Sequence, residues 1–363
     1  MKRTHAATVE PLASAASSGA LSVTAASASI KGRKLTNEDV VVSVPWLDRP
    51  PQGAAEEQPP AARRAFYAVL DGHGGRDCAE WVAERLPPLL ASTLHGAKAS
   101  AEIKEAMRKA FVQCDAELLE QCERCGWSDG CCAIGLLLDS LCSPPRAYVA
   151  NLGDSRAYAA VVDGSAEGVT ATGGGSDSGA SGGGGSGGGV RAVALSKDHS
   201  PLDAKEKRRV LAAGGSVEGG RVGGCLEVSR SLGDARFKRL GVSATPEVTS
   251  FAIGAAQNFV LLACDGVWRV MDGQRAVEWV HARLPAMDAR RVQLASQLDD
   301  PDAASALTRE RLERLRAERD GATEAALLRE LLHECVAVRH AKDNCTVVLV
   351  RLACEAVAKS SVP

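Results

Sequence analysis

Apolar runs in this chain end repeatedly at an aspartate, and this pattern constrains the fold more than any other feature of the sequence. The run "FYAVL" stops at Asp71, "FVLLAC" stops at Asp265, and Asp154 stands in a tight turn between "AYVANLG" and "SRAY". A carboxylate beside a buried strand costs free energy through desolvation, unless it is paired or binds a metal ion. The pattern therefore indicates acids that are paired or that bind a metal.

Further acids also stand next to apolar runs. Asp343 stands at the start of the run "CTVVLV", and Glu38 and Asp39 come directly before "VVVSV". Carboxylates that converge from distant parts of a chain are typical of a site for Mg²⁺ or Mn²⁺, which prefer oxygen ligands. Gly72 lets the backbone approach closely, so its carbonyl can join the ligands. A single Asp-Gly pair is more often a hairpin turn, so the prediction depends on the number of such positions.

His73 follows Asp71 by two residues, in the stretch "LDGHGG". An imidazole beside a metal-binding aspartate can donate a proton to a leaving group, because its ordinary pKa lies near neutral pH. A solvated loop histidine is the alternative, and the residues alone leave both interpretations open.

The composition excludes some classes of partner. The chain has 363 residues, 45% of them hydrophobic, which is enough for a substantial core. With 43 basic and 45 acidic residues the net charge is -2, so electrostatics give no reason to expect binding to nucleic acid or to an anionic membrane. No apolar run approaches the length of about 20 residues that a membrane-spanning helix needs.

The twelve cysteines are scattered, and no secretory signal precedes them. Reduced thiols and a location in the cytoplasm or nucleus are therefore expected. The Ala/Ser-rich start of the chain also allows a transit peptide, although Glu10 and the scarcity of arginine favour a disordered tail. Cys122 and Cys125 form a lone C-x-x-C without a second pair at metal spacing, so we interpret them as a coincidence at a helix end.

Low-complexity stretches divide the chain. We expect a disordered tail over 1–19, a single domain over 20–354 with flexible insertions at 48–64 and 164–189, and a second tail over 355–363. Strand-like runs flank the Gly/Ser tract on both sides, which favours an insertion over a linker between domains. Helices occur in pairs between groups of consecutive strands, which indicates an α+β fold with antiparallel sheets.

Seven stretches resemble, in order, the metal-dependent Ser/Thr protein phosphatases of type 2C: "FYAVLDGHGG", "NLGDSRAYA", "SKDHSP", "AAGGSV", "LEVSRSLGD", "LLACDGVW" and "DNCTVVLV". The resemblance covers about residues 20–352, and the run 195–271 is most similar to the integrin-linked-kinase-associated branch. It implies two antiparallel β-sheets packed as a sandwich, with a helical pair on each outer face and metals in a cleft at one edge. It also implies a monomer that acts on phosphoproteins.

The resemblance further implies roles for the acids. Asp71 would bridge two Mg²⁺ or Mn²⁺ ions, with the Gly72 carbonyl on one of them and Asp265 and Asp343 on the other. A further set would act through water or shape the site: Glu38, Asp39 and Asp154. A hydroxide between the metals would attack phosphorus, and His73 would protonate the departing seryl or threonyl oxygen.

The chain departs from the family pattern at several positions. Lys34 stands where the family usually has a phosphate-anchoring arginine, with Arg33 beside it, and a lysine lacks the bidentate fork. The sequence does not decide which of the two anchors phosphate. Arg269 replaces an acid of a third, weaker metal site, so we expect that site to be impaired. Cys131 and Cys132 replace hydroxyls near the metals, and the consequences for packing and redox sensitivity stay open.

Two other functions are compatible with parts of the sequence. A pseudophosphatase would bind phosphoproteins without turnover; Lys34 favours it, whereas the intact predicted ligands oppose it. A two-metal hydrolase of small phosphoesters would need a closed pocket, whereas the stretch 197–224 resembles the exposed segment that borders the active site in the phosphatase family. We expect an active protein phosphatase.

Overall fold

The structure is a computed structural model that describes residues 21–49, 60, 62–162, 189–254, 256–299 and 308–354. The predicted tails 1–19 and 355–363 lie outside these ranges, as do all residues of the predicted insertion 164–189 except the last. Of the insertion predicted at 48–64, residues 50–59 and 61 also lie outside them, and Arg64 is already the first residue of a strand.

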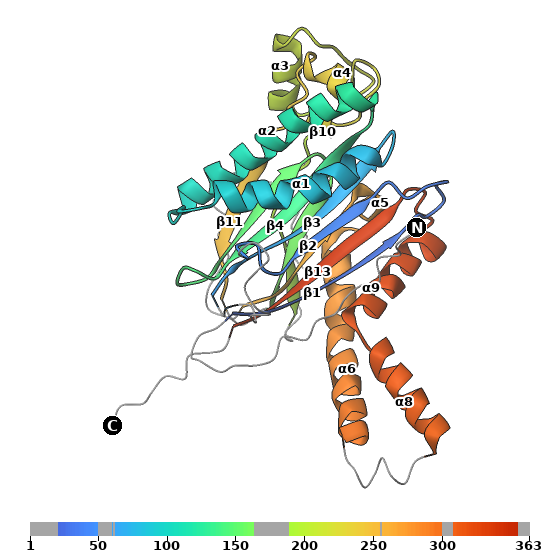
Figure 1. Ribbon diagram of the computed structural model, residues 1–363. Helices are drawn as coiled ribbons and strands as arrows, with labels where there is room; N and C mark the ends of the chain where they lie inside the picture. Colours follow the sequence, from blue (N-terminus) through green and yellow to red (C-terminus); the bar gives the residue numbers. More distant parts are fainter. Residues whose placement is uncertain are drawn as a thin grey trace.

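Two antiparallel sheets form the centre of the molecule (Figure 1). The first sheet has the order β1 (Leu21–Ile30), β13 (Cys345–Cys354), β12 (Gln257–Ala263), β6 (Arg156–Val162) and β7 (Val190–Ala194). The second has the order β11 (Glu247–Ala252), β5 (Arg146–Leu152), β4 (Gly130–Asp139), β3 (Arg64–His73) and β2 (Val40–Val44), and β10 (Leu232–Gly233) pairs with the start of β4.

The sheets bury one common core between them. Val69 and Ile134 of the second sheet belong to the same apolar cluster as Val260 and Val350 of the first. Every residue of β4 is buried, because one face of this strand meets the other sheet and the opposite face meets helices. This explains why its sequence is a continuous apolar run and not an alternating one.

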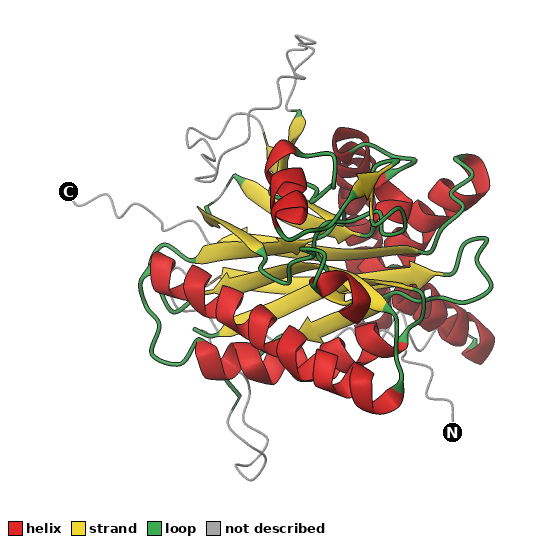
Figure 2. Cartoon of the chain, turned by 90° about the horizontal axis from the view of Figure 1, so that it is seen from above, coloured by secondary structure: helices red, strands yellow, loops and turns green. Residues whose placement is uncertain are grey.

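Helices cover both outer faces of the sandwich (Figure 2). On the second sheet lie α1 (Asp77–Thr93) and α2 (Ser100–Cys125), which pack on each other and on the sheet. On the first sheet lie α6 (Gly273–Asp299) and α9 (Glu324–His333), which continues into a π-helical turn, Glu334–Val338. A further helix, α8 (Arg309–Gly321), packs on α6. The predicted fold class is confirmed.

A segment between β7 and β11 folds beside one end of the sandwich (Figure 1). We call residues 200–245 the flap segment. It contains α3 (Ala204–Ala212), β8 (Val217–Glu218), β9 (Arg221–Val222), β10 and α4 (Ala235–Lys238). Its own small core includes Val210, Phe237 and Val242. This segment forms one wall of the pocket described below.

The apolar run at Asp71 ends before the strand does. The ladder between β3 and β4 continues through Asp71, Gly72 and His73, and the last of these pairs with Gly130. The strand thus extends three residues beyond the apolar run and ends in Asp-Gly-His, because backbone pairing continues where apolar side chains stop. Asp265, in contrast, directly follows a strand and begins the short helix α5 (Asp265–Trp268). Within the described ranges, no helix has the length and apolar character of a membrane span.

Candidate metal centre

A pocket of about 350 Å³ lies where the ends of the strands meet the flap segment. Most of the predicted site residues line it, from both sheets and from the loops that follow them: Lys34, Asp71, Gly72, His73, Asp154, Asp265 and Asp343. Among the described residues, three predicted ones do not line it: Arg33, Glu38 and Asp39. The strand ends that the sequence singled out therefore meet at one place.

Asp71 belongs to two groups of possible metal ligands. In the first group, carboxylate oxygens of Asp71, Asp154 and Asp265 all lie within 4.8 Å of one another. In the second, oxygens of Asp71 and Asp39 lie within the same distance of each other and of the Cys264 thiol. From the sequence we expected Asp154 to act through water or to shape the site, and we did not expect Cys264 at the site.

The crowded carboxylates have strongly perturbed acidities. Burial raises the pKa of Asp71 well above its usual range, and the charges of Asp39 and Asp265 raise it further. Burial and the neighbouring Asp154 raise the pKa of Asp265 to about 7. Burial also raises the pKa of Asp39 to about 6, although a hydrogen bond from Thr346 opposes this. Lys34 and Arg269 contact only Asp343 and Asp265 of this cluster, so negative charge remains in excess, and a divalent cation would balance it.

Two features show that the residues fit a metal. The Asp39 Oδ1 atom is buried and has no hydrogen-bond partner among the described residues. At Gly72, a Cβ atom would lie 2.5 Å from the carbonyl oxygen of Glu38, so only glycine permits the close approach of these two segments. The arrangement leaves carboxylate and carbonyl oxygens together, which is the donor set that Mg²⁺ and Mn²⁺ prefer.

Asn344 fixes the loop that carries Glu38. Its side-chain oxygen accepts a hydrogen bond from the Glu38 backbone N–H at 2.9 Å. Its Nδ2 group donates to the carbonyls of Lys31 and Thr36 at 2.8 and 2.9 Å. The residue next to Asp343 therefore holds the start of the chain against its end. The sequence showed this asparagine only as a neighbour of the acid.

The side chains of Lys34 and Arg33 contact different parts of the structure. The Lys34 Nζ atom lies 2.9 Å from Asp343 Oδ1 and lines the pocket. This hydrogen bond raises the pKa of Lys34, although partial burial opposes the shift. Arg33 instead contacts His340, with 3.5 Å between Nη2 and Nδ1. Of the two candidate phosphate anchors, Lys34 is the one that the structure places at the pocket.

His73 has a carboxylate partner that the sequence did not reveal. Its Nε2 atom lies 2.8 Å from Asp234 Oδ2 in the flap segment, and the Asp234 side chain is only 3% exposed. Burial lowers the pKa of His73, but the hydrogen bond and the charge of Asp234 outweigh burial and raise it. Asp234 itself has a left-handed backbone conformation, with φ 53°. Asp234 thus favours the protonated form of an imidazole that lines the pocket.

Arg269 connects the carboxylates to the flap segment. Its Nη2 atom lies 2.5 Å from Asp265 Oδ2 and 2.9 Å from Glu227 Oε2. Arg221 pairs with the other oxygen of Glu227. Arg269 stands where the family has an acid of the third metal site, so a guanidinium lies there in place of a carboxylate.

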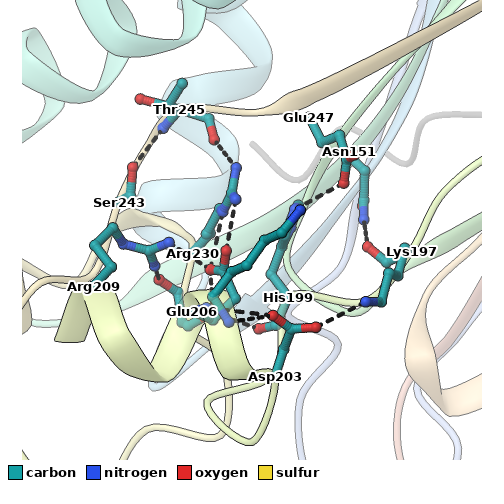
Figure 3. Close-up of polar contacts among 12 residues, drawn as sticks. Asn151, Lys197, His199, Asp203, Glu206, Arg209, Arg230, Ser243, Thr245 and Glu247 are labelled. Carbon is teal, nitrogen blue, oxygen red and sulfur yellow. Dashed lines mark hydrogen bonds and ion pairs between the residues drawn. The ribbon is translucent and has the colours of Figure 1, made fainter. Parts of the chain in front are cut away.

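A buried glutamate holds the flap segment together (Figure 3). Glu206 accepts hydrogen bonds from Arg209, from Ser229 and from the Nε and Nη2 atoms of Arg230. Burial alone would raise the pKa of Glu206, but these donors lower it to about 2. Figure 3 shows the two arginines converging on this carboxylate, with the Asp203–Lys197 pair beside it. None of these residues lines the pocket, but they hold together the segment whose other residues form one of its walls.

The two cysteines that replace hydroxyls are buried. Cys131 and Cys132 are at most 3% exposed, and Cys132 lines the pocket. Burial raises the pKa of both thiols well above the ordinary value. A thiol that stays protonated is a poor nucleophile. Gly153 packs so closely on Cys132 that a Cβ atom there would lie 2.2 Å from the sulfur.

Comparisons with known proteins identify the class. A family model described as "Protein phosphatase 2C" matches residues 25–319. "Probable protein phosphatase 2C 67" of Oryza sativa subsp. japonica is 32% identical over 335 residues, which is 91% of this chain and 75% of the relative. "Integrin-linked kinase-associated serine/threonine phosphatase 2C" of Bos taurus is 33% identical over 235 residues, 62% of this chain and 56% of the relative.

Solved structures share the fold. A serine-threonine phosphatase 2C from Toxoplasma gondii has a TM-score of 0.61 at 21% identity, covering 96% of this chain and 99% of the other. This likeness shows that the two chains share a fold. The chain belongs to the protein phosphatase 2C family. The resemblance read from the sequence is confirmed, and its relatives include the integrin-linked-kinase-associated branch.

Proposed function

We infer that this protein hydrolyses phosphoserine and phosphothreonine in proteins, with two Mg²⁺ or Mn²⁺ ions at the carboxylate pocket. The observation that carries this proposal is the position of Asp71, which belongs to two ligand groups at once. A carboxylate shared between two groups suits a residue that bridges two cations. Family membership supports the same chemistry.

The residues that would hold the ions directly are Asp71, Asp265 and Asp343, together with the Gly72 carbonyl. Glu38, Asp39 and Asp154 would act through water, so Asp71 and Asp265 are the members of the two groups that would touch the ions, and Asp343, which is in neither group, is assigned from the family pattern. When bound, the ions lower the pKa of a water molecule and neutralise the charge of the phosphoryl oxygens. This chain's carboxylates contribute by remaining close together in a buried place, where a cation is strongly attracted.

Lys34 would hold the phosphoryl group. Its ammonium lies at the pocket, and Asp343 is the only described acid within 4.0 Å of it. When Asp343 binds a cation, the ammonium can turn to a phosphoryl oxygen. A lysine provides a point charge and not a planar fork, so it orients the phosphoryl group less strictly than an arginine would.

His73 would donate a proton to the seryl or threonyl oxygen as the P–O bond breaks. An alkoxide is a poor leaving group, and proton transfer in the transition state typically accelerates such a step by about 10²–10⁴-fold. Asp234 favours the protonated imidazole by raising its pKa, and its hydrogen bond orients the ring. No covalent phosphoenzyme is needed, and the buried cysteines have no part in the reaction.

The wider setting follows the same proposal. The substrates are phosphoproteins, and the protein acts as a monomer in the cytoplasm or nucleus. One domain over residues 20–354 contains the whole site. These statements rest on the family and on the composition, and each stays a prediction.

Phosphate release from a phosphothreonine peptide tests the proposal, with Mn²⁺, Mg²⁺ or EDTA in parallel. We expect release that needs the metal and that is lost in Asp71→Asn, with circular dichroism to show that the variant is folded. Absence of release by folded protein at millimolar Mn²⁺ would support the pseudophosphatase instead. Lys34→Arg is then the variant that should restore turnover if the lysine is the cause.

A further inference from the structure

Arg236 lies at the same pocket and is not used by the reaction described above. It lines the pocket, its side chain is exposed, and no described acid lies within 4.0 Å of its guanidinium. The other two arginines of this wall, Arg221 and Arg269, share the carboxylate of Glu227. Among the described arginines that line the pocket, Arg236 alone has no ion-pair partner.

Arg236 lies on the side of the pocket where the leaving group departs. It belongs to α4, two residues after Asp234, the acid that holds His73. If His73 protonates the seryl or threonyl oxygen, as the proposed function states, the peptide chain of the substrate must leave the pocket on the His73 side. Arg236 therefore lies on the side from which the residues flanking the phosphorylated one emerge.

The side chain of Arg236 is held in place by stacking. Its guanidinium carbon lies 4.5 Å from the centroid of the Phe237 ring, and Phe237 is only 5% exposed. A guanidinium that stacks on a fixed aromatic ring loses little conformational entropy when it binds. Its N–H edge stays available for a bidentate contact with a carboxylate or a phosphoryl group.

We propose that Arg236 binds an anionic side chain of the substrate, so that the protein prefers phosphopeptides with a second negative charge near the phosphorylated residue. The partner group is a carboxylate of Asp or Glu, or a second phosphoryl group. This inference rests on the proposed function, because the leaving-group side of the pocket is defined by His73. Arg236 acts on specificity, and it takes no part in bond breaking.

The test compares kcat/KM for peptides that share one phosphothreonine. One peptide has neutral flanks, others carry Glu at single positions on either side, and others carry a non-hydrolysable phosphonate analogue of phosphoserine. We expect the best Glu peptide to exceed the neutral one by about 3–5-fold and the phosphonate peptide by about tenfold, as for a charge-assisted contact at a partly exposed site. The ratio between peptides on one enzyme is the quantity measured.

Variants assign the preference to this residue. Arg236→Gln should reduce the ratio to about one, and Arg236→Glu should invert it, so that a peptide with a lysine flank becomes preferred. Arg239→Gln is the matched control, because Arg239 is also exposed but does not line the pocket. It should keep the full preference.

The outcomes separate this inference from the proposed function. Hydrolysis of all peptides at the same kcat/KM, or a preference that Arg236→Glu leaves unchanged, would overturn the role of Arg236 and leave the phosphatase activity standing. If no peptide and no p-nitrophenyl phosphate were hydrolysed, the proposed function would fail. Fluorescence anisotropy with the same peptides then measures binding without turnover, and equal Kd values for wild type and Arg236→Glu would overturn the contact as well.

Discussion

Substitution of Asp234 by asparagine should impair the reaction in a way that depends on the leaving group. Asp234 is nearly fully buried, and its Oδ2 atom lies 2.8 Å from His73 Nε2. It also accepts a hydrogen bond from Ser231 Oγ at 2.6 Å, which asparagine can keep through its own oxygen. The change therefore removes the charge that holds the imidazolium while it preserves the shape of the side chain.

The structure sets the size of the effect. A hydrogen bond to a charged partner contributes about 1.5–3 kcal/mol. Each 1.36 kcal/mol changes a rate about tenfold, so kcat for a phosphothreonine peptide should fall by about 10–100-fold. The Asp234 charge also raises the pKa of His73, so its loss makes the protonated imidazole less populated at neutral pH. p-Nitrophenolate leaves without a proton, so hydrolysis of p-nitrophenyl phosphate should fall much less.

Steady-state kinetics with both substrates measure this difference. A double-variant cycle is the control: in a His73→Gln background, Asp234→Asn should have almost no further effect on the phosphopeptide, because the two residues act as one unit. Equal losses with both substrates, or additive losses in the cycle, would refute the assignment of His73 and Asp234 to proton donation.

Three further predictions concern other parts of the site. Lys34→Gln should raise KM for a phosphopeptide by about tenfold, whereas Lys34→Arg should leave it equal or lower, since a guanidinium adds a second hydrogen bond; a KM unchanged in both variants would exclude Lys34 as the anchor. The pKa of Glu206 is lowered from 4.5 to about 2, so its ion pairs stabilise the fold by about 3 kcal/mol above pH 4.5 and lose this as the pH falls toward 2. Urea unfolding of Glu206→Gln should therefore show a deficit at pH 7 that shrinks at pH 3, and a deficit constant with pH would contradict this. Gly72→Ala should weaken Mn²⁺ binding, because its Cβ would meet the Glu38 carbonyl at 2.5 Å; calorimetric titration that shows unchanged affinity would count against a role for this close approach.

Much of the site could be predicted because its acids interrupt apolar runs. Asp71, Asp154 and Asp265 all stand out in this way, and the structure brings their oxygens together. Asp234 could not be predicted from such a pattern, since it follows the short polar stretch "SRSLG" and reaches His73 only through the fold of the flap segment. Cys264 appears in the sequence as the last residue of an apolar run, and only the pairing of β12 with β13 places its thiol beside Asp39.

The sequence predicted the helices and strands of the fold better than it predicted which strands pair with each other. The sequence indicated helices in pairs between groups of consecutive strands, and α1 with α2 is such a pair between β3 and β4. The pairing of β1 with β13 joins opposite ends of the chain, with Leu21 opposite Cys354, and no local pattern encodes such a contact. Only the family resemblance predicted the sandwich. The choice between Lys34 and Arg33 also needed the structure, because adjacent residues in a loop can point in any direction.

The most direct test of the central claim, that strand-end carboxylates form a binuclear metal site, is a calorimetric titration of metal-free protein with Mn²⁺. We expect two ions per chain for the wild type and loss of at least one of them in Asp71→Asn, because this residue belongs to both ligand groups. Asp115→Asn is a suitable control, since this buried acid pairs with Lys238 and does not line the pocket. No binding by folded wild type at millimolar Mn²⁺, or equal binding by Asp71→Asn, would contradict the account.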